Sequence, residues 1–380
     1  MKTVKLGDAF KFNPPVRIAR GQNVPFVSMD QLHPWTRDVA AAEVRNYSSG
    51  SKFKQGDVLM SRITPCLQNG KISRYNSREH GDVAAGSTEF IVVRGIDGVS
   101  ITDFAYYSMI SPRIHEKAVV SMTGTSGRQR VRLDDLLDIN ILLPDLVEQK
   151  KIVEVLGALD DKIAANQRVI EVSDALLHSW WSTKVADRGR PIPLSSLARF
   201  VNGKAFTKKA TGEGRVVVRI TELNSGITGS TVRNEIEVDP DNEVNRGDFL
   251  MAWSGSLTTA RWYRDQAIVN QHIFKVIPKG DNSMWAVACA VEQQMEYFKR
   301  IAADKATTMG HIQRRHLDEK TLWVGDLTPQ EEHYGRSLWK RALAAEIENE
   351  QLARTRDELL PLLMDGRITV KDAERVVEEV

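Results

Sequence analysis

The chain contains 380 residues, of which 27% are charged and 42% are hydrophobic, a composition typical of a soluble globular protein with two or more domains. No apolar run approaches the roughly 18 residues that a membrane span needs, and MKTVKLGDAF at the start lacks the apolar core of a signal peptide, so we expect a cytoplasmic protein. Cys66 and Cys289 lie far apart and match no metal-binding spacing, which argues against a disulfide framework and a zinc site.

The charge is distributed unevenly along the chain, although the formal net charge is only +2. Residues 1–143 and 185–326 together carry +8, whereas residues 144–184 and 327–380 together carry −6. This pattern is expected if basic globular domains bind a polyanion and the acidic stretches do not.

The first motif in the chain is FNPPV, residues 12–16. Asn-Pro-Pro followed by an aromatic residue is the active-site loop of adenine-N6 methyltransferases, where the ring stacks on the flipped base. Val16 occupies the ring position here and cannot stack, and no glycine-rich turn for S-adenosylmethionine follows a strand. We therefore interpret Asn13-Pro14-Pro15 as a turn.

Short β-branched or aromatic segments bounded by turn residues predict β-rich domains, for example residues 90–93, 216–218 and 273–277. We expect helices over residues 103–114 and 283–302 to cover the sheets. The same order of segments occurs twice, which indicates an internal duplication. Its landmarks keep near-constant offsets: Gly56-Asp57 and Gly247-Asp248 are 191 residues apart, Pro144 and Pro329 are 185 apart, and Ile163 and Ile347 are 184 apart.

Two long helical runs, residues 146–182 and 329–364, follow the two β-rich domains. A continuous helix over the first run would be about 55 Å long, longer than one domain needs. Seven of its ten heptad a and d positions are apolar: Gln149, Ile152, Leu156, Leu159, Ile163, Asn166, Ile170, Ser173, Leu177 and Trp180. We predict that the two helices form an antiparallel pair. The alternative is that each lies as an amphipathic helix on its own domain.

Two stretches of the sequence carry a family resemblance. TRDELLPLLMDGRITV, residues 355–370, resembles the R-D-x-L-L-P-x-L-x-S-G-x-I-x-V end of specificity subunits of type I restriction-modification enzymes. GTSGRQRVRLDDLLDINILLPDLVEQKKIVEVLGALDDKI, residues 124–163, is similar to the same family's passage from a recognition domain into a helix, including a P-x-x-x-E-Q-x-x-I start. The second helix start departs from this pattern, because His333 follows Glu332 where Gln149 follows Glu148.

The resemblance implies an α+β fold with two β-rich target recognition domains in a pseudo-twofold arrangement, separated by two long antiparallel coiled-coil helices. It places recognition domains at residues 1–143 and 185–326, a spacer helix at 144–184, and a second spacer helix with a C-terminal segment at 327–380. Each recognition domain would read one half of a bipartite, asymmetric double-stranded DNA target, and the helices would set the gap between the half-sites.

The resemblance further implies a subunit without catalysis of its own and without a bound cofactor, metal or membrane. Methyltransferase subunits, two of them, would dock on the helices and bring S-adenosylmethionine, and restriction subunits would bring ATP and Mg²⁺. The candidate partner contacts lie on the two helices: Glu148, Gln149, Ile152, Leu338, Leu352 and Leu360.

Loops rich in Arg, Lys, Asn and Gln are the candidate DNA-binding segments, because these side chains bind base edges or phosphates. The candidates in the first domain are Arg62, Thr64, Gln68, Asn69, Lys71, Thr125, Ser126, Arg128, Gln129 and Arg130. Those in the second are Lys204, Lys208, Trp253, Ser254, Arg261 and, within residues 307–315, His311, Gln313, Arg314 and Arg315. The alternative for each loop is a solvated surface charge.

Two other functions stay open on the sequence. One is an enzyme, either a self-contained DNA methyltransferase or a nuclease, against which the missing cofactor loop argues. The other is a solitary DNA-binding protein of the same architecture.

Overall fold

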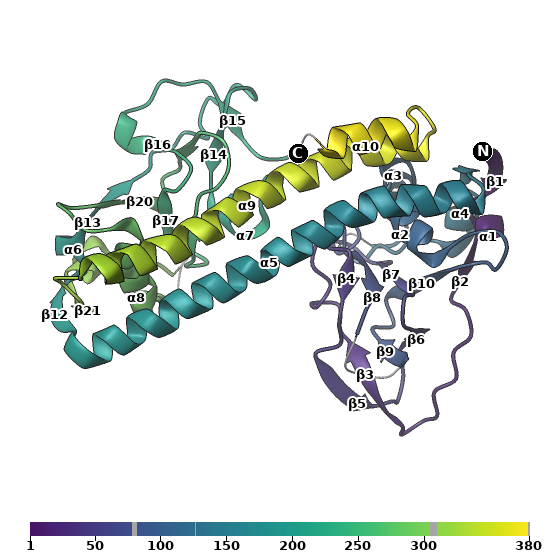
Figure 1. Ribbon diagram of the computed structural model, residues 1–380, viewed down its shortest axis with the longest axis horizontal. Helices are drawn as coiled ribbons and strands as arrows, with labels where there is room; N and C mark the ends of the chain where they lie inside the picture. The colour runs from purple at the N-terminus through teal and green to yellow at the C-terminus, as the bar shows by residue number, and fades with distance from the viewer. Residues whose placement is uncertain (78–81, 126, 305–309, 379–380) are drawn as a thin grey trace. The chain divides into compact units, whose positions relative to one another are not determined.

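A computed structural model describes residues 1–77, 82–125, 127–304 and 310–378 (Figure 1). The chain divides into two compact units: unit 1 comprises Met1–Lys162 and Gln351–Val380, and unit 2 comprises Ile163–Glu350. The boundary falls inside both long helices, α5 (Leu146–Arg188) and α9 (Pro329–Met364), so each helix contributes residues to both units. Among the described residues, no helix has the length and apolar character needed to span a membrane.

Unit 1 contains a five-stranded sheet of order β2-β10-β7-β8-β4, a four-stranded sheet of order β5-β3-β9-β6, and the pair β1-β11. Its strands are β1 (Lys2–Lys5), β2 (Phe10–Phe12), β3 (Asn23–Val27), β4 (Asp38–Val39), β5 (Glu43–Asn46), β6 (Ser51–Lys54), β7 (Val58–Ser61), β8 (Ile72–Tyr75), β9 (Val83–Gly86), β10 (Phe90–Gly95) and β11 (Asn140–Leu143). Its shorter helices are α1 (Leu6–Ala9), α2 (Thr102–Ile110), α3 (Pro112–Val120), α4 (Leu133–Leu137) and α10 (Val370–Glu378).

Unit 2 contains sheets of order β13-β20-β17-β18 and β15-β14-β19-β16, and the pair β12-β21. Its strands are β12 (Arg190–Pro193), β13 (Ala198–Asn202), β14 (Arg215–Val218), β15 (Arg233–Asn234), β16 (Glu243–Val244), β17 (Phe249–Ala252), β18 (Thr259–Arg261), β19 (Ala267–Val269), β20 (Ile273–Pro278) and β21 (Lys320–Trp323). Its shorter helices are α6 (Leu194–Leu197), α7 (Ile220–Ser225), α8 (Met284–Asp304) and the 3-10 turns η1 (Pro240–Asn242) and η2 (Arg314–Asp318).

The strand orders of the two units match except that β4 of unit 1 has no counterpart among the described strands of unit 2, which confirms the predicted duplication in topology. Strands β3 and β9 pair in parallel in unit 1, as β14 and β19 do in unit 2. The repeated Gly-Asp turn is built in the same way: Asp57 Oδ2 accepts a hydrogen bond from Lys54 N at 2.7 Å, and Asp248 Oδ2 accepts one from Asn245 N at 2.7 Å. The preceding Gly56 and Gly247 adopt φ angles of +88° and +93°, where a side chain would be strained.

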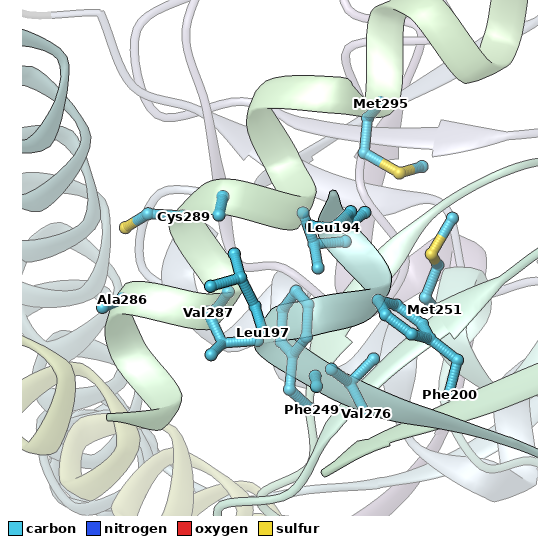
Figure 2. Close-up of a cluster of buried hydrophobic side chains, with 14 of the residues drawn as sticks. Leu194, Leu197, Phe200, Phe249, Met251, Val276, Ala286, Val287, Cys289 and Met295 are labelled. Carbon is cyan, nitrogen blue, oxygen red and sulfur yellow. The ribbon is translucent and has the colours of Figure 1, made fainter. Parts of the chain in front are cut away.

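A core of unit 2 lies between the sheet β13-β20-β17-β18 and the helices that cover it. Figure 2 shows Phe249, Met251 and Val276 from the sheet gathered with side chains of α6 and α8, and all three are buried. In unit 1, the buried helix α2 covers the equivalent sheet through residues such as Phe104 and Tyr106. Apolar burial of this kind is the main favourable contribution to folding.

The predicted strands at residues 90–93, 216–218 and 273–277 are confirmed as parts of β10, β14 and β20. The predicted helix over residues 103–114 is wrong in one respect, because it is interrupted at Ser111 and continues as α3 from Pro112. Proline lacks a backbone N–H and favours the first turn of a new helix, which explains the break.

The two long helices run antiparallel within unit 2, as predicted. Asn166 Nδ2 donates a hydrogen bond to Glu348 Oε2 at 2.7 Å, and the Trp180 and Tyr334 rings lie 5.4 Å apart. All ten predicted a and d side chains of α5 are buried or half-buried, so the heptad seam is the inward face of this helix. Helix α5 also packs on the β-rich domain of each unit. The antiparallel pairing and the packing on a domain, which the sequence left as alternatives, therefore occur together.

The helical segments of unit 1 are joined by a buried ion pair. Arg356 Nη1 on α9 donates to Asp160 Oδ1 on α5 at 2.8 Å, and both side chains are about 5% exposed or less. Tyr107 on α2 donates its hydroxyl proton to Asp160 Oδ2 at 2.7 Å. The pair therefore fastens both helices to the covering helix of the sheet.

The two helix starts contact equivalent helices through different residues. Gln149 Oε1 accepts a hydrogen bond from Ile101 N, the residue that precedes α2, at 3.0 Å. Glu332 Oε1 accepts one from Ser283 Oγ, the residue that precedes α8, at 2.5 Å, and its Oε2 accepts one from Trp285 Nε1. Glu332 thus makes at the second helix start the contact that Gln149 makes at the first, where His333 stands in the position equivalent to Gln149.

We predict that the stability of unit 2 depends on pH through Glu331. Lys184 and Arg188 bind its carboxylate at 2.9 and 2.5 Å, and these bonds, with one from Thr328 N, lower its pKa from 4.5 to about 2. A lowered pKa means that the carboxylate stabilises the fold above pH 4.5 and that this contribution is lost as the pH falls towards 2.

Denaturant unfolding followed by tryptophan fluorescence tests this, because seven of the eight tryptophans lie in unit 2. Glu331→Gln should lower the unfolding midpoint at pH 7 and flatten the decline between pH 4.5 and 2. Glu213→Gln, a change at an exposed carboxylate of the same unit, should leave the profile unchanged. An identical pH profile for Glu331→Gln and the native chain would contradict the prediction.

Candidate nucleic-acid interface

Three backbone hydrogen bonds in unit 1 join the loop after β7 to two distant segments. Arg62 N donates to Glu89 O at 2.9 Å, just before β10 begins. Val131 N donates to Arg62 O at 2.9 Å, and Thr64 N donates to Gln129 O at 3.0 Å. These bonds bring together the two loops that the sequence singled out, residues 62–71 and 124–130.

The same three bonds recur in unit 2 in the same order. Trp253 N donates to His272 O at 3.1 Å, just before β20 begins. Ile312 N donates to Trp253 O at 3.0 Å, and Gly255 N donates to Gly310 O at 2.8 Å. We call each set of three bonds the loop frame of its unit.

Each loop frame presents three equivalent side-chain positions, one from each segment. A bridge between the first loop and the last segment, Ile63 with Arg130 in unit 1 and Ser254 with His311 in unit 2, fixes the alignment. The six frame positions are Arg62, Glu89 and Arg130 in unit 1, and Trp253, His272 and His311 in unit 2.

The frame positions of unit 1 are charged. Arg130 Nε donates to both carboxylate oxygens of Glu89 at 3.1 and 3.0 Å, and Arg130 Nη2 donates to Glu89 Oε1 at 2.6 Å. The hydrogen bonds from Arg130 hold the pKa of the Glu89 carboxyl below its usual value. Arg62 is half-buried and its Nη2 makes a long 3.5 Å contact with Val131 O.

The frame positions of unit 2 are aromatic. The Trp253 ring lies 5.6 Å from the His272 ring and 6.4 Å from the His311 ring, and it stacks on Phe274 at 5.8 Å. Trp253 Nε1 donates to Asn202 Oδ1 at 2.7 Å, which fixes the plane of the indole. Ser254 is 4% exposed, and its Oγ lies 2.9 Å from His272 Nδ1.

The remaining candidates of unit 1 divide between exposed tips and internal supports. Gln68, Asn69, Thr125 and Arg128 are exposed. The supports are Thr64, which is 7% exposed and whose Oγ1 accepts from Gln129 N, and Lys71, whose Nζ donates to Met29 O at 2.9 Å. Ser126 lies outside the described residues, as do residues 307–309 of the stretch singled out in unit 2.

The remaining candidates of unit 2 are exposed, with one exception. Lys204, Lys208, Gln313, Arg314 and Arg315 are all exposed. Arg314 Nη2 donates to Phe200 O at 3.0 Å, beside a groove of about 620 Å³ whose lining also includes the cationic side chains Arg199 and Lys279.

The exception, Arg261, requires a correction. Its side chain is buried, and its guanidinium binds Glu346 on α9 at 2.8 Å and Asp174 on α5 at 3.2 Å. Arg261 also lies over the Trp339 ring at 4.5 Å. A guanidinium committed to two carboxylates inside unit 2 has no groups left on the surface for DNA, so its structural role is to fix β18 to the long helices.

The predicted partner contacts also need correction, because most of them are buried within their own unit. Glu148 and Leu338 are half-buried. The buried side chains are Gln149, Ile152, Leu352 and Leu360, with exposures of 0%, 1%, 6% and 3%. The heptad positions that suggested a partner surface are thus filled by the chain itself.

A different face of α5 carries exposed apolar side chains. Val169, Val172 and Leu176 are 37%, 57% and 47% exposed, and a spacing of three and four residues places them on one face of the helix. They lie away from the buried heptad seam. This stripe was not predicted from the sequence, because the seam accounts for the strongest apolar periodicity of the helix.

The amino-terminal part of the chain matches a known protein family. Residues 1–172 match the family model of the type I restriction modification DNA specificity domain. This part of the chain is therefore similar to the specificity subunits of type I restriction-modification enzymes. The resemblance drawn from the sequence is thereby confirmed.

Two curated relatives of this family come from Escherichia coli. The specificity subunit of the type I restriction enzyme EcoAI is 24% identical over 148 residues, which are 38% of this chain and 25% of that protein. The EcoEI specificity subunit is 26% identical over 161 residues, which are 41% of this chain and 27% of that protein. The chain thus aligns with about a quarter of the length of these relatives.

A solved structure of the family has the same fold as this chain. The crystal structure of the type I restriction-modification system S subunit from M. genitalium has a TM-score of 0.52 at 15% sequence identity, covering 96% of both chains. This likeness and the topology above confirm the predicted α+β class with β-rich domains and two long helices.

We predict that Gly70 is essential to the shape of the first loop of unit 1. It adopts φ +73°, and an added Cβ would lie 2.3 Å from the Trp35 ring, which packs over it. Gly70→Ala should therefore lower the free energy of unfolding by about 2–4 kcal/mol, from the strained φ angle and the steric clash together.

Gly21→Ala is the matched control for the φ angle alone. Gly21 adopts φ +82°, and nothing lies within 4 Å of an added Cβ, so this change should cost only about 1–2 kcal/mol. Adding Trp35→Ala to Gly70→Ala should recover part of the difference in a double-mutant cycle measured by denaturant unfolding. Equal losses of unfolding free energy in Gly70→Ala and Gly21→Ala would contradict the prediction, because they would show that the Trp35 ring moves aside without a cost in stability.

Proposed function

We propose that this chain is the DNA-recognition subunit of a type I restriction-modification complex and is not itself an enzyme. The observation that carries the proposal is that a chain similar to specificity subunits repeats one loop frame in two units. Each frame gathers exposed or half-buried Arg, Gln, Asn or aromatic side chains, the residue types that bind base edges and stack on bases.

In this proposal each unit reads one half of a bipartite double-stranded DNA target. The base-reading residues are the frame side chains and the exposed loop residues Gln68, Asn69, Arg128 and Gln313. Exposed cations such as Lys204, Lys208 and Arg315 bind phosphates, which position the protein without selecting sequence. The different frame side chains in the two units support an asymmetric target.

The long helices serve as the spacer between the half-sites. Helix α5 has 43 residues, which corresponds to a helix of about 65 Å. Half-sites read on one face of the duplex lie about one helical turn, roughly 34 Å, or a multiple apart. A continuous helix is stiff enough to hold such a gap constant.

Two methyltransferase subunits supply the chemistry, with S-adenosylmethionine, and restriction subunits with ATP and Mg²⁺ complete the enzyme in the cytoplasm. The names of the curated relatives, which are specificity subunits of type I restriction enzymes, support this assignment. The methyltransferase subunits dock on the exposed stripe of α5 formed by Val169, Val172 and Leu176.

A methyl-transfer assay tests the function. The purified chain, incubated with labelled S-adenosylmethionine and genomic DNA, should transfer no methyl groups. Addition of the cognate methyltransferase subunit should give methylation of adenines in one bipartite sequence. Methyl transfer by the chain alone would favour a self-contained methyltransferase, and DNA binding without any stable methyltransferase complex would favour a solitary DNA-binding protein.

Val172→Asp and Leu176→Asp test the docking stripe. Each places a charge on a surface that would become apolar and dry in the complex, which should weaken co-purification of the methyltransferase subunit at least tenfold. Binding of the isolated chain to DNA should not change. Ser182→Asp, which adds the same charge at an exposed position on another face of α5, should have no effect on co-purification. Equal effects at all three positions would contradict docking on this stripe.

A further inference from the structure

We infer that Glu89 is a positioning residue that orients Arg130 to read a guanine in the first half of the target. This inference rests on the proposed function and assigns a role to Glu89, which is not in either loop with candidate DNA contacts. Glu89 lies between β9 and β10 and enters the interface only because its backbone carbonyl accepts the bond from Arg62 N in the loop frame.

The backbone of Glu89 is held in place on both sides of its side chain. Glu89 N donates a hydrogen bond to Ser87 Oγ at 3.2 Å, and Glu89 O is bound by the frame. Its side chain is 23% exposed, so one side of the carboxylate faces the protein. The carboxylate is therefore carried by a fixed backbone and is partly shielded from solvent.

Arg130 uses one edge of its guanidinium on this acceptor. Nε and Nη2 bind the Glu89 carboxylate, and Nη1 has no hydrogen-bond partner among the described residues. The end of the guanidinium formed by Nη1 and the second Nη2 proton is left for another planar acceptor. The Arg130 side chain is 47% exposed, which gives an external ligand access to that end.

The O6 and N7 atoms of guanine form such an acceptor in the major groove. A guanidinium has five donors in a fixed plane, so one edge can bind a carboxylate while the end binds the base. Holding the plane before DNA arrives lowers the conformational entropy lost on binding. The contact with the Glu89 carboxylate, which we call the clamp, therefore makes Arg130 selective for a base edge. An arginine without this contact would bind phosphates equally well.

The equivalent positions of unit 2 cannot form this clamp. His272 occupies the Glu89 position and His311 occupies the Arg130 position, and the Trp253 ring lies between 5 and 7 Å from both imidazoles. These side chains include no guanidinium and no carboxylate. The guanine preference should therefore belong to one half-site only.

A selection from randomised DNA with the complex of this chain and its methyltransferase subunit tests the inference. The native complex should select a bipartite sequence with a G·C base pair that Arg130→Ala no longer prefers. Glu89→Gln should reduce the preference at that base pair about tenfold and leave the other half-site unchanged. Arg130→Lys keeps the charge but loses the fork, and it should lose the same preference while non-specific binding persists.

Several outcomes separate the possibilities. Glu116→Gln, the same change at an exposed glutamate of α3, should leave every position unchanged, and denaturant unfolding of each variant checks that it folds. An even loss of affinity over all sequences for Glu89→Gln and Arg130→Ala would assign Arg130 to a phosphate and overturn the inference. An unchanged preference in Glu89→Gln would also overturn it. A native complex that selects no sequence would instead refute the proposed function.

Discussion

The backbone hydrogen bonds of the loop frames are the constraint on which both candidate interfaces depend. Each frame joins segments that are far apart in sequence, such as Arg62 and Val131, through backbone N–H and C=O groups. Because the bonds involve only the backbone, the same frame forms around Arg62 in unit 1 and Trp253 in unit 2. The frame fixes the position of each of its three side chains and does not constrain their chemical type.

Buried ion pairs hold the long helices in position, as the loop frames hold the loops. Asp160 and Arg356 join α5 and α9 in unit 1, and Arg261 joins β18 to both helices in unit 2. Burial of Glu346 raises its pKa although Arg261 opposes this, a sign that desolvation is costly there. Such pairs add little net stability, but a shifted helix register would leave a charge buried without its partner. They therefore favour one alignment of sheet and helices.

The helices and strands could be predicted from local sequence signals. The candidate interface depends on contacts between residues that are far apart in the sequence. The bounds of α9 follow from Pro329 and the heptad pattern, and the duplication follows from repeated Gly-Asp turns. The burial of Arg261 could not be predicted, because its partners lie 85 and 87 residues away in the sequence. Glu89 was missed for the same reason: a single acidic residue at a turn gains meaning only when Arg130 is placed beside it.

Under the proposed function, the separation of frame from side chain lets one fold recognise two different half-sites. If specificity depended on the residues that hold the loops, a change of target would also change stability. In this protein the holding bonds belong to the backbone and the supports belong to buried groups such as Thr64 and Ser254. The frame side chains are at least partly exposed, and surface substitutions away from buried networks usually change stability by less than about 0.5 kcal/mol. Charged frame side chains in unit 1 and aromatic frame side chains in unit 2 are therefore compatible with a single topology.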